Sequence, residues 1–358
     1  MATGEPENTK RAFVYRSGVR VAGTVLACDA ATGGDLVFLS HAPAPVARGR
    51  RATAALGHGR RQILATEQTL ALLGPAGERL RPHALAATYG RPFHLGKLRL
   101  EIFPSGFMPG SASLLCEADG RRIVYAGPIG PGAREVRAAD ALCIDASFAR
   151  ADVQLPTRVE ALTTVGAAVR DALAAGDSPV LLVEPAATAL DVAAALAGDG
   201  VGLAAHRDVM MAAATYRDAG LAAPPLQRFA GRVASGEALL WPARRPAPAR
   251  RAGARPHRLI FVSADQACPV ADCPRVAFPT GADLAALLSY VAEVGASEVA
   301  LVNAPGQDIT RALRARGIDA YAVGPPRQTD LFVTLDGNPH RVGAPSPPKP
   351  SPDATDAA

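Results

Sequence analysis

The chain has 358 residues, which is long enough for two domains or for one domain with a large insertion. Hydrophobic residues make up 49% and charged residues 20%, enough for packed cores, and the net charge of +5 permits an anionic partner without requiring one. Five Cys without a CxxC pair, a polar N-terminus and no apolar run of membrane-spanning length argue against a secreted or membrane protein and predict a cytoplasmic one.

The first 150 residues are predicted to consist mainly of strands. Apolar runs indicate strands at residues 12–15, 19–28, 35–40, 63–66, 98–103, 114–118, 122–126 and 140–144. A helix is expected at 67–73, with Thr66 as its N-cap. Asp119 and Gly120 are typical of the tight turn of a hairpin, so they join the strands on either side.

From residue 158 onward, predicted helices and strands alternate, which is typical of an α/β unit with parallel pairing. Helices are expected at 158–175, 188–197, 209–219, 283–294 and 308–316. Strands are expected at 179–183, 202–205, 238–241, 259–263, 275–278, 298–302 and 320–323. Residues 242–257 are rich in Pro, Arg and Ala, which predicts an extended linker, and residues 341–358 are predicted to be a disordered tail.

Six segments, taken in chain order, carry a resemblance to a known family. They are ILATEQTLALL (63–73), SGFMPGSAS (105–113), GRRIVYAGPIG (120–130), LCIDASFA (142–149), AHRDVMMAAATYRDAGLAAPP (205–225) and the closing run from VAFPTGAD to AYAV (276–323). Together they resemble the metallo-β-lactamases with an inserted β-CASP domain. Within that family they are most similar to the bacterial ligase-associated DNA exonucleases and the mRNA 3′-end processing factors.

The resemblance implies an α/β fold, a metallo-β-lactamase αββα sandwich with an inserted β-CASP-like α/β domain. It places the first part of the metallo-β-lactamase-like domain at residues 12–150. The β-CASP-like insert, which ends in the Arg/Pro linker, falls at 155–258. The closing part of the first domain falls at 259–333.

The family uses two zinc ions, which activate a water molecule and hold the scissile phosphate. By the resemblance, the family's ligand and active-site positions are occupied here by Pro43, Pro45, Val46, Phe107, Pro128, Gly281 and Asn303. Asp29, His41 and Asp145 are the remnants of the family pattern. Pro, Val, Phe and Gly side chains have no lone pair for a metal, so the resemblance implies a degenerate site without a metal cofactor and without catalytic residues.

The replacements also lead to an expectation about packing. Apolar side chains at these positions are expected to fill the emptied metal cleft, because burying them is favourable where unpaired carboxylates would be costly. His41 is expected to be a hydrogen-bonded structural residue. Asp29 and Asp145 are expected to accept backbone N–H bonds in turns.

Two groups of arginines are candidate nucleic-acid contacts. Their members are Arg48, Arg50, Arg51, Arg244, Arg245, Arg250 and Arg251. They would act as nonspecific phosphate contacts, or they are simply solvated surface in an Arg-rich protein. Apart from Trp241, no aromatic residue for base stacking lies near them in the sequence.

The resemblance therefore implies a pseudoenzyme, a non-catalytic scaffold or partner subunit in DNA repair or RNA processing. Its implied protein partner is an active nuclease or a ligase. Two alternatives remain open: a nucleic-acid-binding module that uses the Arg-rich surface, and a residual metal-dependent hydrolase or exonuclease.

Overall fold

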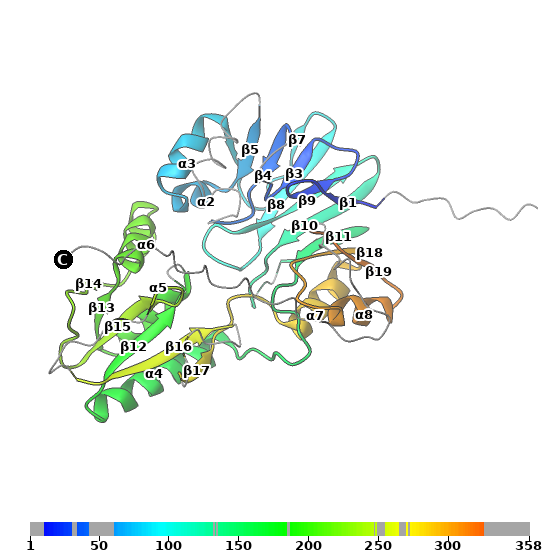
Figure 1. The fold of residues 1–358 in the computed structure, drawn as a ribbon. Helices are drawn as coiled ribbons and strands as arrows, with labels where there is room; N and C mark the ends of the chain where they lie inside the picture. The colour runs from blue at the N-terminus through cyan, green and yellow to red at the C-terminus, as the bar shows by residue number, and fades with distance from the viewer. Residues whose placement is uncertain are drawn as a thin grey trace, which may run out of the picture. The chain divides into compact units, whose positions relative to one another are not determined.

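The computed structural model describes residues 11–30, 34–42, 61–131, 133, 135–184, 187–246, 248, 255–264, 270 and 273–325. This described part is a mixed α/β protein with nineteen strands in three sheets and seven α-helices, which confirms the predicted α/β class (Figure 1). Its residues up to Gly324 belong to one compact unit. None of its helices is both long enough and apolar enough to cross a membrane.

The first sheet takes its six strands in sequence order. They are β1 (Phe13–Tyr15), β2 (Val19–Val21), β3 (Leu26–Cys28), β4 (Leu36–Phe38), β5 (Gln62–Ala65) and β6 (Ala84–Ala86). The first three pair antiparallel and the remainder pair parallel. The prediction of one strand over 19–28 is wrong, because a turn separates β2 from β3. In that turn Gly23 has φ 76°, and the Thr24 hydroxyl donates to the Val21 carbonyl at 2.9 Å.

Two short helices, α2 (Glu67–Leu72) and α3 (Pro75–Leu80), cover the outer face of the first sheet. The predicted N-cap of α2 is confirmed, since Thr66 Oγ1 accepts a hydrogen bond from the Thr69 amide at 2.9 Å. The helices bury apolar side chains against those of the sheet, including Val37, Ile63, Leu70 and Leu80. Only α2 is predicted by the sequence pattern.

The second sheet has seven strands in the order β19-β18-β11-β10-β9-β8-β7. They are β7 (Phe93–Leu95), β8 (Leu98–Pro104), β9 (Ala112–Ala118), β10 (Arg121–Gly127), β11 (Ala141–Asp145), β18 (Glu298–Val302) and β19 (Asp319–Ala322). The hairpin between β9 and β10 is confirmed, with both turn residues at positive φ, as a two-residue turn of this kind requires. β11 pairs in parallel with β18, so strands from distant parts of the chain lie side by side.

The first and second sheets share one core, in which Phe38 and Leu64 pack with Leu100, Leu114 and Cys143. The opposite face of the second sheet packs against α7 (Leu284–Val294) and α8 (Asp308–Arg314). Helices thus lie on the outer side of each of these two sheets (Figure 1).

The beginning and the end of this sandwich are tied together. The Ala12 amide donates to Glu298 Oε1 at 2.7 Å, and the Tyr321 hydroxyl donates to the same carboxylate at 2.6 Å. The guanidinium carbon of Arg11 lies 4.0 Å from the centre of the Tyr321 ring, which is a cation–π contact. The residues that lead into β1 are therefore held by residues of β18 and β19.

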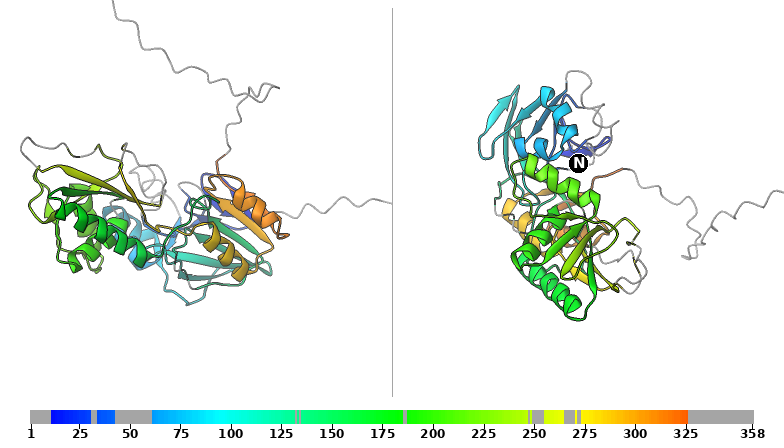
Figure 2. Two further views of the ribbon diagram at one scale, coloured as in Figure 1. Left: turned by 90° about the horizontal axis from the view of Figure 1, so that it is seen from below. Right: turned by 90° about the vertical axis from the view of Figure 1, so that its left-hand side faces the viewer.

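The third sheet is all parallel, in the order β14-β13-β15-β12-β16-β17. Its strands are β12 (Ser178–Val183), β13 (Gly202–Ala205), β14 (Gln227–Arg228), β15 (Glu237–Pro242), β16 (His257–Ser263) and β17 (Arg275–Ala277). One face packs against α4 (Arg158–Ala174), α5 (Ala187–Gly198) and α6 (Arg207–Asp218) (Figure 2). The predicted alternation of helices and parallel strands is confirmed.

The third sheet extends further along the chain than the predicted insert. The insert is predicted to end at residue 258, whereas β16 pairs with β12 and β17 pairs with β16. An apolar run such as residues 259–263 carries no mark of which parallel sheet it joins. The predicted disordered tail, 341–358, and residues 247 and 249–254 of the predicted linker lie outside the described residues. Of the described linker residues, Pro242 ends β15 and His257 begins β16.

Candidate functional site

The remnant residues Asp29 and His41 are joined through Ser40, which follows β4. Asp29 Oδ1 accepts from the Ser40 amide at 2.9 Å, which confirms the expected role of Asp29 as an acceptor of a backbone N–H. Its Oδ2 accepts from the Ser40 hydroxyl at 2.5 Å and from the Tyr125 hydroxyl at 2.9 Å. Burial, with the charge of Asp29 nearby, raises the pKa of Tyr125 well above its ordinary value, so Tyr125 remains a hydroxyl donor.

This arrangement sets the proton position on His41. Ser40 Oγ lies 2.8 Å from His41 Nδ1 and has one hydrogen, which it donates to Asp29. Nδ1 must therefore carry a proton and donate it to Ser40 Oγ. The imidazole is oriented by a hydroxyl and a carboxylate behind it, as in sites where a histidine binds or transfers protons.

Phe107 lies beside His41, in the loop between β8 and β9. The two ring centres are 5.2 Å apart and the planes cross at 83°, an edge-to-face contact. The far end of this loop is fixed to α2, because the hydroxyls of Thr66 and Thr69 both donate to the Gly110 carbonyl, at 2.7 and 2.8 Å. The aromatic neighbour of His41 is thus carried by an anchored loop.

Gly281 is buried against another aromatic ring. A Cβ atom at this position would lie 2.9 Å from Cδ2 of Phe148, a distance that Cβ atoms essentially never show, and 3.1 Å from Cε2, which is tighter than most Cβ contacts. Phe148 therefore occupies the space into which a side chain at position 281 would project. A histidine fits there only if the Phe148 ring moves.

The remaining described positions of the resemblance are Pro128, Asp145 and Asn303. Pro128 follows β10 and is half-buried. Asp145 accepts from the Ser147 amide at 2.9 Å, as expected for a turn, and from Asn303 Nδ2 at 2.6 Å. Asn303 itself has φ 57°, a left-handed conformation that Asn tolerates well. Asp145 and Asn303 therefore form a separate polar pair.

The described residues do not fit the dinuclear zinc site that the resemblance implies. Within the part of the chain that the structure describes, no group of three or more His, Cys, Asp or Glu side chains could hold a metal ion. The side chains of Phe107 and Pro128 offer no ligand atom, Gly281 has no side chain, and the Phe148 ring fills the space beside Gly281. Pro43, Pro45 and Val46 lie outside the described residues.

His41 and Phe107 line a cavity of about 510 Å³. The expectation that apolar replacements fill the emptied cleft is therefore wrong for Phe107, which forms a wall and leaves space beside it. Besides these two residues, the cavity is lined by Met108, Pro131, Phe148, Arg158, Glu184, Ala187, Thr188, Asp191, Arg244, Val262, Ser263, Phe278, Pro279 and Thr280. Loop residues after β4, β8, β10 and β11 thus share the cavity with the strand ends of the third sheet.

Two ion pairs border this cavity. Arg158, the first residue of α4, pairs with Asp191 of α5, and Arg244 Nε lies 3.2 Å from Glu184 Oε1. The Asp191 side chain is 24% exposed, against 51% for Arg158. Burial raises the pKa of Asp191 from its ordinary value, and the neighbouring Arg158 offsets part of that rise.

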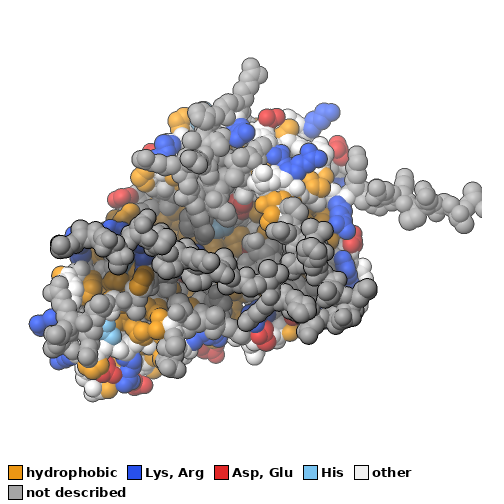
Figure 3. Space-filling view, viewed as in Figure 1, with side chains coloured by type: hydrophobic (Ala, Val, Ile, Leu, Met, Phe, Trp, Pro, Cys, Tyr) orange, Lys and Arg blue, Asp and Glu red, His pale blue; other side chains and the backbone are white. Residues whose placement is uncertain are grey.

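The described arginines of the predicted nucleic-acid surface already have acidic partners. Arg244 pairs with Glu184, and Arg245 Nη2 lies 3.1 Å from Asp208 Oδ2. Arg48, Arg50, Arg51, Arg250 and Arg251 lie outside the described residues. On the face drawn in Figure 3, Lys and Arg side chains are interspersed with Asp and Glu.

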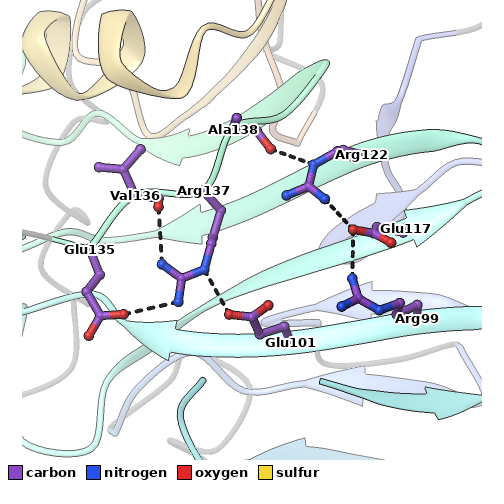
Figure 4. A network of polar contacts seen from close by, with 8 residues as sticks. All are labelled: Arg99, Glu101, Glu117, Arg122, Glu135, Val136, Arg137 and Ala138. Atoms are coloured by element: carbon purple, nitrogen blue, oxygen red, sulfur yellow. Dashed lines mark hydrogen bonds and ion pairs between the residues drawn. The ribbon is translucent and has the colours of Figure 1, made fainter. Parts of the chain in front are cut away.

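A second charged network lies on the strands of the second sheet, outside the cavity (Figure 4). Glu117 of β9 stands directly opposite Arg99 of β8 and Arg122 of β10 and pairs with both. Beside them, Arg137 Nε lies 2.8 Å from Glu101 Oε1. Alternating charges on neighbouring strands stabilise a solvated sheet face, so this network needs no ligand to explain it.

His41, Phe107 and Arg244 are site residues named from the sequence, and sequence reasoning did not connect the other residues with this cavity. A local signal marks one of them, because Thr157 and Glu160 form a capping box that starts α4 and so places Arg158 in its first turn. No local signal pairs Arg158 with Asp191, or Phe148 with Gly281.

No protein-family model matches the chain, and a search of curated proteins found no significant match.

Proposed function

We propose that this chain is a non-catalytic member of the metallo-β-lactamase proteins with a β-CASP insert. It acts as a scaffold or partner subunit for an active nuclease or a DNA ligase in DNA repair or RNA processing. Two features of the fold support the proposal. Two facing sheets have helices on their outer sides, and a parallel α/β unit enters between β11 and β18, which are neighbours in one sheet.

The observation that carries the non-catalytic part is the apolar packing at two of the family's active-site positions, Phe107 and Gly281. Phe107 packs edge-to-face on His41, and Phe148 occupies the space in front of Gly281. Phe107 stands where the resemblance places a metal-binding histidine, and Gly281 stands where it places an active-site histidine. Neither Phe107 nor Gly281 offers a ligand nitrogen, which would have to reach a zinc ion at about 2.0–2.1 Å.

Metal analysis and nuclease assays of the purified full chain test the proposal. We expect no stoichiometric zinc or manganese after dialysis against micromolar metal, and no cleavage of single-stranded or duplex DNA or RNA. Stoichiometric metal together with cleavage that His41→Ala abolishes would overturn the proposal in favour of a residual hydrolase or exonuclease.

Salt dependence separates the scaffold from a nucleic-acid-binding module. Phosphate contacts make affinity fall steeply with salt, with a slope of about −0.7 per contact for single strands. Because Arg244 and Arg245 already pair with acids, we expect Arg244→Gln and Arg245→Gln to leave any affinity for random-sequence oligonucleotides within about twofold. Strong binding at low salt that both substitutions weaken would favour the nucleic-acid-binding module.

A further inference from the structure

We infer that the cavity beside His41 binds a small zwitterion with an apolar body, the chemistry of an aromatic or branched-chain α-amino acid. This goes beyond the proposed scaffold function and does not depend on it.

The walls suit an apolar side chain. Phe107, Met108, Phe148 and Phe278 line the cavity, together with Pro131, Pro279 and Val262. A volume of about 510 Å³ lies within the range of about 300–1,000 Å³ for small-molecule sites, which are mainly apolar with a few polar groups. The cavity is larger than the side chain of one amino acid, so the ammonium and carboxylate groups can lie at its polar border. We use this name for the two ion pairs Arg158–Asp191 and Arg244–Glu184.

The Arg158–Asp191 pair is one of the two ion pairs of the polar border and offers a partner for each charge of a zwitterion. Arg158 is at the first position of α4, where a cation opposes the helix dipole, and Asp191 is largely buried. Both placements work against local stability, and such placements concentrate where a protein binds or reacts. An incoming carboxylate would bond to Arg158 while an ammonium group bonds to Asp191.

The second pair makes the border electrically balanced. Arg244 and Glu184 add one more charge of each sign, so the four groups together carry no net charge when all are ionised. A polyanion would be attracted by the two arginines and repelled by the two carboxylates. A zwitterion gains a partner for each end, which is why we favour an amino acid over a phosphate ligand.

The position in the fold agrees with a ligand site. Glu184 follows the end of β12, Ser263 ends β16, and Arg244 follows the end of β15. All three strands are parallel, so their carboxyl ends meet at one edge of the third sheet. Ligands of parallel α/β sheets bind at this edge.

The first experiment compares four ligands on the wild-type chain by isothermal titration calorimetry. L-phenylalanine and L-leucine carry both charges, 3-phenylpropionate carries only the carboxylate, and phenethylamine carries only the ammonium. We expect both amino acids to bind, and each single-charge analogue to bind at least tenfold more weakly than L-phenylalanine. Absence of binding by both amino acids, or equal binding by either analogue, would overturn the inference.

The second experiment uses matched variants. Arg158→Gln and Asp191→Asn each remove one half of the border pair. The pair Arg170 and Asp199 also connects α4 with the end of α5, at 3.1 Å, and does not line the cavity, so Arg170→Gln and Asp199→Asn are the controls. We expect the first two substitutions to weaken L-phenylalanine binding at least tenfold and the controls to change it less than twofold.

Equal losses in the border and control variants would also overturn the inference, because they would report helix destabilisation instead of ligand contact. The wild-type comparison needs no variant, so a misfolded variant does not leave the question open. Neither experiment measures metal content or nucleic-acid cleavage. A negative result for amino-acid binding therefore leaves the proposed scaffold function untouched.

Discussion

Replacing Gly281 with Ala tests whether Phe148 holds the place of a side chain there. The new Cβ would lie 2.9 Å from Phe148 Cδ2. Carbon atoms in contact lie about 3.5–4.0 Å apart, so the ring must move by about 0.6–1.1 Å. Overpacking of this kind costs about 1–3 kcal/mol. Phe148 also lines the cavity, and the open space lets it move, so we expect the low end, about 1 kcal/mol.

Urea unfolding, monitored by circular dichroism, measures the change in unfolding free energy at constant m-value. Gly198, at the exposed end of α5, is the matched control, because nothing lies within 4 Å of its built Cβ. Alanine there should stabilise the protein by up to about 1 kcal/mol, since Gly is the poorer helix former. The contrast separates the packing effect at Gly281 from the general effect of replacing Gly.

A double-mutant cycle assigns the cost to the ring. In a Phe148→Ala background, Gly281→Ala should cost less than about 0.5 kcal/mol, because the clashing atoms are gone. If Gly281→Ala costs the same in both backgrounds, or costs nothing in the wild-type chain, Phe148 does not fill the position and the reasoning is refuted.

Three further substitutions test polar groups. Asp29→Asn preserves a residue type that tolerates φ 45° but replaces a carboxylate that accepts three hydrogen bonds, so urea unfolding should show a loss of about 1–3 kcal/mol. Thr157→Ala removes the capping box of α4 and should lower the unfolding free energy by about 0.5–2 kcal/mol. Burial raises the pKa of Tyr216 to about 12, so the folded chain retains this proton after the unfolded chain loses its own. The contribution of Tyr216 to the unfolding free energy should be complete below about pH 10. It should fall by up to about 1.4 kcal/mol per pH unit between pH 10 and 12, and Tyr216→Phe should reduce that fall.

Each of these expectations has a contradicting result. An unchanged urea midpoint for Asp29→Asn would mean that the bonds to Ser40 and Tyr125 contribute little. An unchanged urea midpoint for Thr157→Ala would mean that the capping box of α4 contributes little to stability. Identical alkaline profiles for wild type and Tyr216→Phe, measured by urea unfolding at steps of one pH unit, would show that Tyr216 does not contribute to the loss.

The predictions from sequence succeed where short-range chemistry decides the structure. The turn at Asp119 and Gly120 requires positive φ, which these two residue types tolerate, and Thr66 caps the helix that follows it. The spacing of apolar residues in 158–175 predicts α4. They fail where the deciding contact is not local. The alternating pattern of residues 19–28 continues through the turn at Gly23, so the break between β2 and β3 is not visible in the pattern.

The candidate site shows the same limit more strongly. His41 and Phe107 are identified from motifs, and both line the cavity. The outcome expected of Phe107, a filled cleft, fails because filling depends on what faces it, and the facing residues come from the third sheet. Phe148 meets Gly281, and Arg158 meets Asp191, only after the chain has folded, so no sequence window contains either pair.

The pairing of β11 with β18 has a consequence for synthesis on the ribosome. The third sheet is complete once Ala277 has emerged, whereas the second sheet lacks β18 and β19 until Ala322 has emerged. The N-terminal strand is made first but gains its contacts with Glu298 and Tyr321 only after those residues have emerged. We therefore expect the inserted unit to fold co-translationally, while the earlier-made strands remain open and exposed to chaperones.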